Sequence, residues 1–404
     1  MNILFVTYDI PWPLDAGGKI RAYNMLRMLS EHHQLTLITY YRYEEQLKRL
    51  NAISPLCSRI VTVRRRNVWN PFTAAYLLSL PFPAALYASI SSRQAVASEL
   101  QHRRYDLVHL ESFYTSHLIN TIRGVPIVLG TENIEAEVYR QYVDARALPP
   151  YVLPFANYEI KRLRAYEKKT WKQADVCLAV SDQDAAVIKK QVGTNVVVVP
   201  NGVSREQFPE PFPVRKQAET LLFIGNFSYI QNHDAVLRLL RFVLPHIRPT
   251  VTLLVVGRNA SQQLREEVQR ANAQTPHRVK LEDSFDDVRA VYAQADILVA
   301  PLFVGSGTKY KVLEAMMAGV PVVTSPGGIE GLAVNKERDV LIGESEEQLV
   351  KFTNRLLADD GLRRQLSRSA REQVEKKYTW ERIGGKLEEA YELAKSKNNE
   401  QKDL

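Results

Sequence analysis

The stretch at residues 301–325, which reads PLFVGSGTKYKVLEAMMAGVPVVTS, constrains the fold of this chain more than any other. The apolar run at 297–300 just before it predicts a buried strand, and the run at 322–324 predicts another. Between the two runs lie a loop with glycines and a helical pattern that Gly319 and Pro321 bring to an end. Strand, loop, helix and strand in this order form a βαβ unit, which places both strands in one parallel sheet.

The start of this predicted helix is a candidate anion site. Ser306, Gly307 and Thr308 lie in the loop, where free N–H groups and the helix dipole favour a phosphate. Lys311 and Glu314 are three residues apart, so they share one face of the helix. A cation and a hydroxyl-binding carboxylate beside an anion site are what a sugar nucleotide requires. The stretch therefore predicts an enzyme that uses a nucleotide sugar.

Apolar runs alternate with helical patterns along the whole chain. The runs predicted to be strands occupy residues 3–8, 35–40, 60–64, 107–110, 127–130, 176–180, 196–200, 221–225, 252–257, 279–282, 297–300, 322–324 and 340–342. Apolar, β-branched strands separated by helices are typical of parallel sheets that are covered on both faces. Since 404 residues exceed what one core usually supports, we expect an α/β protein with two doubly wound Rossmann-like domains.

The boundary between these domains is predicted from a segment with three prolines and no apolar periodicity, residues 203–220. This linker leaves residues 1–202 for the first domain and 221–377 for the second. Ligands of doubly wound folds bind at the carboxyl ends of the strands. We therefore expect the site in a cleft that the two domains face.

The composition of the chain narrows the classes of molecule that the protein is expected to bind. The net charge of +8 suits phosphorylated small molecules or an anionic membrane surface. Nucleic acid is the least favoured partner, because the cations are dispersed and no nucleic-acid-binding motif is present. No apolar run is long enough to span a bilayer, and the N-terminal stretch is interpreted as a core strand and not a signal peptide, which predicts a cytoplasmic protein. The two cysteines and eight histidines lack the spacing of metal ligands, so no metal is expected.

Two predicted strand ends in the first half carry candidate site residues. Gly17 and Gly18 follow the first strand, where they allow either close backbone approach to a ligand or simply a tight turn. Glu132 follows the strand at 127–130. It can contact a sugar, act as a general base, or cap the next helix.

Two predicted strand ends in the second half add polar side chains. Asn226 and Gln231 follow the strand at 221–225 as uncharged hydrogen-bonding groups. Arg258 follows the strand at 252–257, where a guanidinium can hold a phosphate by two hydrogen bonds or form a surface ion pair.

The segment at residues 59–86 combines basic and aromatic side chains. Arg64, Arg65 and Arg66 are followed by Trp69 and Phe72 and then by further apolar residues. This combination suits docking on an anionic membrane or a lipid-linked substrate. The alternative is that the apolar groups line the core or the acceptor cleft of the first domain.

The motifs taken together resemble those of the retaining glycosyltransferases of family 4, which have the GT-B fold. The resemblance covers nearly the whole chain and rests on four segments, DAGGKIRAYNMLRML, AVSDQD, VVVVPNGV and GSGTKYKVLEAMMAGVPVVTS. It implies transfer of a sugar from a UDP- or GDP-linked donor to a glycan or lipid-linked acceptor, with no metal or other cofactor. It also implies a donor site on the second domain and an acceptor site on the first. The final helix, residues 378–396, would cross back to the first domain.

The resemblance assigns roles position by position. Glu314 matches the glutamate that contacts the donor ribose, and Gly17 and Gly18 match the glycine pair near the diphosphate. Ser306 stands where a sugar-contacting glutamate is often found. Glu132 lies where the family often has a histidine that touches the sugar, so Glu314, Lys311 and Glu132 are the predicted catalytic groups.

A second departure concerns the diphosphate. Asn226 and Gln231 occupy the places of an Arg and a Lys that usually hold it. Lys311, together with Lys309 and Arg258, is the predicted replacement for this charge. The departures leave open a second hypothesis, a non-catalytic nucleotide-sugar-binding subunit that supports a partner transferase. The resemblance further implies a role in bacterial cell-surface polysaccharide or glycolipid synthesis, with peripheral contact at the inner face of the cell membrane.

Overall fold

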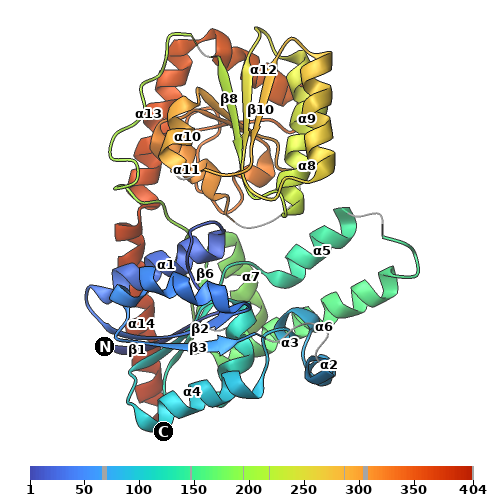
Figure 1. Cartoon of the computed structure of the whole chain (residues 1–404). Coiled ribbons are helices and arrows are strands. Elements are labelled where there is room, and N and C mark those ends of the chain that lie inside the picture. Colours follow the sequence, from blue (N-terminus) through green and yellow to red (C-terminus); the bar gives the residue numbers. More distant parts are fainter. Residues whose placement is uncertain are drawn as a thin grey trace. The chain divides into compact units, whose positions relative to one another are not determined.

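The computed structural model describes residues 1–65, 71–145, 148–193, 195–217, 219–285, 287–303 and 308–402. The chain divides into two compact units (Figure 1). Unit 1 comprises Met1–Pro200 and Ile383–Leu404, and unit 2 comprises Asn201–Arg382. Each unit contains one parallel sheet between helices, so the predicted α/β class with two doubly wound units is confirmed.

Unit 1 is built on a seven-stranded sheet with the order β3-β2-β1-β4-β5-β6-β7. Its strands are β1 (Asn2–Thr7), β2 (Gln34–Tyr41), β3 (Arg59–Arg64), β4 (Leu107–Leu110), β5 (Ile127–Thr131), β6 (Val176–Ala179) and β7 (Asn195–Val198). Its helices are α1 (Gly17–Ser30), α2 (Pro71–Leu77), α3 (Phe82–Ala85), α4 (Ile90–His102), α5 (Glu135–Ala145), α6 (Leu153–Gln173) and α7 (Asp182–Val192), with 3-10 segments η1 (Glu44–Ala52), η2 (Ser54–Leu56) and η3 (Phe113–Thr121). Strand order reverses between β1 and β4, so the crevice of a doubly wound sheet lies at their carboxyl ends.

Unit 2 has a six-stranded sheet with the order β10-β9-β8-β11-β12-β13. Its strands are β8 (Thr220–Ile224), β9 (Thr252–Val256), β10 (Arg278–Glu282), β11 (Ile297–Ala300), β12 (Val322–Thr324) and β13 (Leu341–Ile342). Its helices are α8 (Ile230–Arg238), α9 (Gln262–Gln274), α10 (Val288–Gln294), α11 (Tyr310–Ala318), α12 (Glu346–Ala358) and α13 (Asp360–Lys377), with short turns η4 (Leu239–Val243), η5 (Leu244–His246) and η6 (Pro326–Gly328). Here the order reverses between β8 and β11, which brings the loops after these two strands together.

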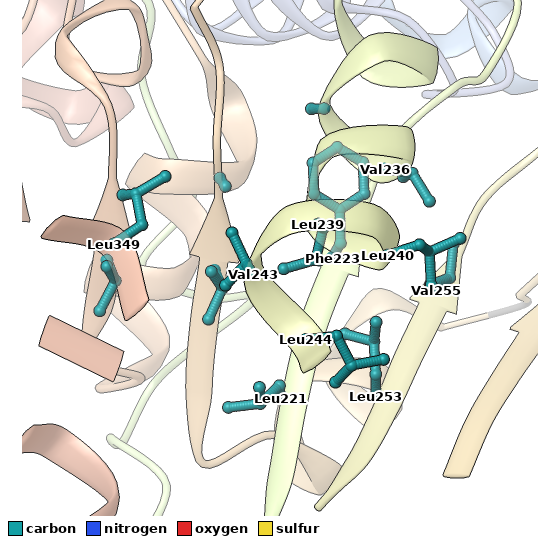
Figure 2. Close-up of a cluster of buried hydrophobic side chains, with 14 of the residues drawn as sticks. Leu221, Phe223, Val236, Leu239, Leu240, Val243, Leu244, Leu253, Val255 and Leu349 are labelled. Atoms are coloured by element: carbon teal, nitrogen blue, oxygen red, sulfur yellow. The ribbon is translucent and has the colours of Figure 1, made fainter. Parts of the chain in front are cut away.

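The strands lie where the sequence predicts them, because the central ones are apolar runs that helices cover on both faces, and the edge strands β3, β7 and β10 are less buried. All four residues of β4, β6 and β11 are buried. In unit 2, helix α8 and its continuation η4 lay Val236, Leu239, Leu240 and Val243 onto the sheet (Figure 2). This packing fixes the first turn of α8 beside the end of β8.

The segment expected to be a linker, residues 203–220, belongs to unit 2 and packs against its helices. The N–H of Phe212 donates to the carbonyl of Ala318 over 2.8 Å. The Arg371 guanidinium donates to the carbonyls of Phe208 (3.1 Å) and Pro209 (2.8 Å). Phe208 itself is buried in the core of this unit.

The C-terminal helix α14 (Trp380–Lys402) begins in unit 2 and belongs to unit 1 from Ile383 onward. Within unit 1 it buries Ile383, Leu387, Ala390 and Tyr391. Among the helices described, α14 included, none is both long enough and apolar enough to cross a membrane.

Both interpretations of the basic and aromatic segment at 59–86, a docking surface and a core lining, are met in part, because some of its apolar residues are buried and others are exposed. Leu80 and Ala84 are buried in a cluster with Phe113, whereas Leu78 and Phe82 are exposed. Arg66 and Trp69 lie outside the described residues, as does the side chain of Phe72.

Candidate active site

The crevice of unit 2 is formed where Gly225 ends β8 and where α8 and α11 begin. Asn232, in the first turn of α8, donates its Nδ2 to the carbonyl of Asn226 over 2.8 Å. Its Oδ1 accepts from Lys311 Nζ over 2.6 Å. Lys311 belongs to α11 but its ammonium group therefore reaches the loop after β8. A Cβ atom at Gly225 would lie 2.8 Å from Asn232 Nδ2 and 2.9 Å from Lys311 Nζ, so glycine leaves room for both side chains.

The ammonium group of Lys311 is held in surroundings that disfavour its charge. Its Nζ lies 4.1 Å from the centroid of the Phe223 ring. Burial and the neighbouring cation Lys309 lower the pKa of Lys311 to about 7, although Glu314 opposes the shift. Burial likewise lowers the pKa of Lys309 to about 8, against the influence of Glu330. Two such cations side by side would both be stabilised by an anion in the crevice.

Glu314 is oriented by a buried tyrosine on the neighbouring helix. The hydroxyl of Tyr292, on α10, lies 3.0 Å from Glu314 Oε2 and 3.1 Å from the carbonyl of Lys311. Tyr292 is fully buried and packs edge-on against the ring of Phe208. Burial raises the pKa of Glu314 to about 7, while Tyr292 and Lys311 act in the opposite direction. The carboxyl group is thus fixed in position with acceptor capacity to spare.

The loop that precedes α11 is described only from Thr308 onward. The buried Thr308 Oγ1 has no hydrogen-bond partner among the residues described. A buried hydroxyl in this state is one that a ligand can satisfy. Ser306 and Gly307 lie outside the described residues.

The other residues predicted for this site have different positions. The Asn226 side chain braces its own loop, since its Oδ1 accepts from Ser228 N (3.0 Å) and from Asn259 Nδ2 (2.9 Å). Arg258 is exposed, and its carbonyl accepts from the N–H of Phe227. Gln231 is half-buried in the first turn of α8.

The contact to Lys311 comes from Asn232, which the sequence analysis did not single out. One signal for it exists in the sequence. Asn232, Ala235, Val236 and Leu239 follow the spacing of a buried helical face, so the first position of that face is an amide among apolar residues. Tyr292 was also missed, because in the sequence it looks like an ordinary core residue.

In unit 1, two of the predicted site residues, Gly18 and Glu132, lie next to each other. A Cβ atom on Gly18 would lie 2.9 Å from each carboxyl oxygen of Glu132 and 2.2 Å from the Tyr8 hydroxyl. Gly17 is the first residue of α1. The buried Glu132 Oε1 has no partner within the described part of the chain. Burial and the nearby Glu111 raise the pKa of Glu132 to about 8, against Arg21.

Glu111, just after β4, is the centre of a buried polar network. Its Oε1 accepts from Arg21 Nε over 2.8 Å and its Oε2 lies 2.6 Å from His109 Nε2. The other ring nitrogen of His109 lies 2.5 Å from the Tyr391 hydroxyl on α14. Burial alone would raise the pKa of Glu111, but Arg21 and His109 together bring it below its ordinary value. His109 is therefore a buried histidine whose two ring nitrogens both have partners.

Arg21 extends this network to the end of β7. Its Nη1 donates to the carbonyls of Val199 (2.9 Å) and Pro200 (3.2 Å). The network thus joins α1, β4 and α14 to the last residues of the N-terminal segment of unit 1.

Comparison with known families matches both units. The model described as "Glycosyltransferase Family 4" matches residues 16–207, and the model described as "Glycosyl transferases group 1" matches residues 218–359. The two matches together cover the crevice residues of unit 2 and every strand of both sheets except β1, which precedes residue 16.

Individual relatives are distant in sequence. An uncharacterized 44.6 kDa protein in the cps region of Klebsiella pneumoniae is 23% identical, over 87% of this chain and 89% of that protein. A phosphatidyl-myo-inositol mannosyltransferase of Mycolicibacterium smegmatis is 28% identical, over 53% of this chain and 56% of its own length. The chain thus spans about half the length of that named transferase.

Solved structures share the fold along nearly the whole chain. Sucrose-phosphate synthase from Thermosynechococcus elongatus has a TM-score of 0.70 at 18% identity, and 97% of this chain and 98% of that one are covered. HepE from Anabaena, solved with UDP and glucose, has a TM-score of 0.67 at 15% identity and covers 96% of this chain and 98% of its own.

Proposed function

The chain belongs to the glycosyltransferases of family 4 (group 1) and has their GT-B fold, and on that premise we propose that it is a retaining enzyme for nucleotide sugars. It moves a sugar from a nucleotide-sugar donor to a glycan or lipid-linked acceptor. The donor occupies unit 2 and the acceptor occupies unit 1. The relative named as a phosphatidyl-myo-inositol mannosyltransferase and the UDP-bound HepE support these substrate classes.

The observation that carries the proposal is the position of Lys311. Its ammonium group lies at the strand-order reversal of unit 2, beside Lys309 and against the loop after β8. In a doubly wound sheet this is the place where phosphates bind. The diphosphate of the donor would be held by Lys311, with the hydroxyl of Thr308 and the start of α11 as further donors.

Glu314 serves the other end of the nucleotide. Three residues after Lys311 on the same helix, its carboxylate accepts hydrogen bonds from the donor ribose hydroxyls. Tyr292 keeps the carboxyl group in place, so little side-chain freedom is lost when the nucleotide binds.

Catalysis then depends on stabilising the leaving group. As the bond between the sugar and the diphosphate breaks, negative charge grows on the diphosphate oxygens, and the protonated Lys311 stabilises it. The acceptor hydroxyl attacks the same face of the sugar and its proton passes to the departing diphosphate. Within unit 1, Glu132 is a polar group available to the acceptor, and its pKa of about 8 makes it a stronger base than an ordinary carboxylate.

A panel of nucleotides tests the donor class directly. UDP, GDP and ADP are compared at one and the same concentration, and a nucleotide present at 100 times its dissociation constant should stabilise the chain by about 2.7 kcal/mol if it binds the folded state alone. We expect one base to shift the midpoint of thermal unfolding and inorganic phosphate to shift it far less. If no nucleotide shifts it, the proposal is wrong. Donor hydrolysis without turnover of any glycan or lipid extract would instead favour a non-catalytic nucleotide-sugar-binding subunit.

Nucleotide binding is expected to take up protons at about pH 8, where phosphate groups are fully ionised. In the free protein, Lys311 and Lys309 have pKa values of about 7 and about 8, so both are partly neutral there. A bound diphosphate favours their charged forms and raises both pKa values. Affinity should therefore fall as the pH rises above this range. Calorimetry in two buffers of different ionisation enthalpy measures the uptake, and identical heats in both would contradict it.

A further inference from the structure

Unit 1 carries a cluster of exposed apolar side chains on two segments that are distant in sequence. The cluster consists of Leu78, Phe82, Tyr151, Phe155 and Tyr158, which we call the arm surface. Leu78 is 89% exposed, Tyr151 83% and Phe155 67%. Exposed apolar residues are ordinary when scattered singly, but a group gathered on two neighbouring segments indicates an interaction site.

Hydrogen bonds join the two segments into one surface. Arg162, on α6, donates from Nη2 to the carbonyls of Leu77 (2.7 Å) and Leu80 (2.9 Å). The N–H of Phe82 donates to Glu159 Oε2 over 3.2 Å. Figure 1 shows α2 and α3 beside α6, in agreement with these contacts. The exposed rings are therefore held in place on a fixed backbone.

The outward face of α6 is strongly basic. Its buried face carries Ile160, Leu163 and Trp171. The outward, exposed positions include Lys161, Lys168, Lys169 and Lys172. A row of aromatic residues therefore continues into a row of cations along one helix.

The two acidic residues of α6 do not offset this charge. Glu159 is paired with Arg162 over 2.5 Å. Glu167 is buried and accepts from the N–H of Glu135 over 2.7 Å. The remaining exposed cation, Arg164, pairs with Glu137.

We propose that the arm surface docks on an anionic lipid bilayer, with its apolar side chains at the level of the headgroups and the lysines of α6 against lipid phosphates. Aromatic rings beside lysines, with no free acid among them, are typical of interfacial membrane segments. Protein–protein interfaces are instead depleted of lysine, and two copies of this face would repel each other. The assignment locates the membrane contact of the proposed function on these residues, and it can fail without affecting donor binding.

Vesicle co-sedimentation of the full chain tests the proposal. The protein should bind vesicles of phosphatidylcholine mixed with phosphatidylglycerol, bind pure phosphatidylcholine weakly, and dissociate as salt is raised. Replacing Lys161, Lys168 and Lys172 with glutamine should lower the partition coefficient about a hundredfold, since each lysine near an anionic surface is worth about fivefold. The double variant Leu78→Ser, Phe155→Ser should lower it about tenfold or more on both kinds of vesicle.

Matched substitutions in unit 2 serve as controls. Phe242→Ser removes another exposed ring, and glutamine at Lys351, Lys376 and Lys377 removes three other exposed lysines. Neither control should change vesicle binding. The proposal is overturned if the chain ignores anionic vesicles, if the arm variants bind as the parent does, or if they abolish only a dimer of the chain. All variants should keep the nucleotide-induced thermal shift, so its loss would count against the donor site instead.

Discussion

Replacing Lys311 with alanine is expected to weaken the binding of a nucleoside diphosphate by about tenfold or more. The ammonium group of Lys311 is the cation we place on the diphosphate beside the loop after β8, because the Asn226 side chain in that loop is occupied with Ser228 and Asn259. A charge-assisted hydrogen bond contributes roughly 1.5–3 kcal/mol, and this range sets the size of the loss. Isothermal titration with the nucleotide chosen by the thermal-shift panel measures it.

The control for this substitution is Lys351→Ala, which removes an exposed lysine from α12 in the same unit. Its affinity should equal that of the parent. Unchanged affinity in Lys311→Ala would mean that the phosphates bind elsewhere.

If Lys311→Ala lost affinity because the variant unfolds, a measurement of its free energy of unfolding would show this. Burial lowers the pKa of Lys311 from 10.5 to about 7, so the unfolded chain binds more protons between these values. The stability of the parent therefore falls as the pH falls through this window, and the alanine variant avoids that cost. At about pH 7 the variant should be no less stable than the parent.

The strands of both units could be predicted because they are apolar, β-branched runs that end in glycine or polar residues. This pattern depends only on burial on both faces of a sheet, which is a local property of each run. The βαβ unit around α11 (Tyr310–Ala318) was predicted with its helix and both strands for this reason.

The partners of the site residues could not be predicted, because they depend on strand order. β8 and β11 are neighbours in the sheet although more than seventy residues separate them, and only that pairing brings Asn232 to Lys311. Tyr292 reaches Glu314 across the packing of two helices. A hydrogen bond of this kind leaves no periodic signal in the sequence.

The same limit applies in unit 1. His109 lies within an apolar strand, so its burial follows from the sequence pattern. Its partner Tyr391 lies on a helix near the other end of the chain. Glu111 follows the same strand and was not singled out, yet its negative charge helps to raise the pKa of Glu132.

Replacing Glu111 with glutamine is expected to lower the free energy of unfolding of unit 1 by about 3–5 kcal/mol. The substitution keeps the size of the side chain but removes the carboxylate that is paired with the buried Arg21 guanidinium over 2.8 Å. Hydrogen exchange measured by mass spectrometry can follow the effect, and protection should fall in peptides of α1 and α14 while unit 2 is unchanged.

The matched control is Glu388→Gln, which breaks the 2.7 Å contact of another glutamate on α14 with His33. Because Glu388 is partly exposed, its loss should cost at most about 1 kcal/mol. Equal effects of the two substitutions would contradict a special role for the buried network.

Charge and packing can be separated by a double-mutant cycle with Arg21→Met. If the buried charges interact, the double variant should cost about 0.5–3 kcal/mol less than the sum of the two single variants, because it leaves neither charge alone.

The pH dependence gives an independent criterion. The pKa of Glu111 is lowered in the folded state, so its contribution is complete above the ordinary carboxyl range and is lost as the pH falls through the folded value. The difference between the parent and Glu111→Gln should therefore shrink on acidification, whereas a packing defect would persist at every pH.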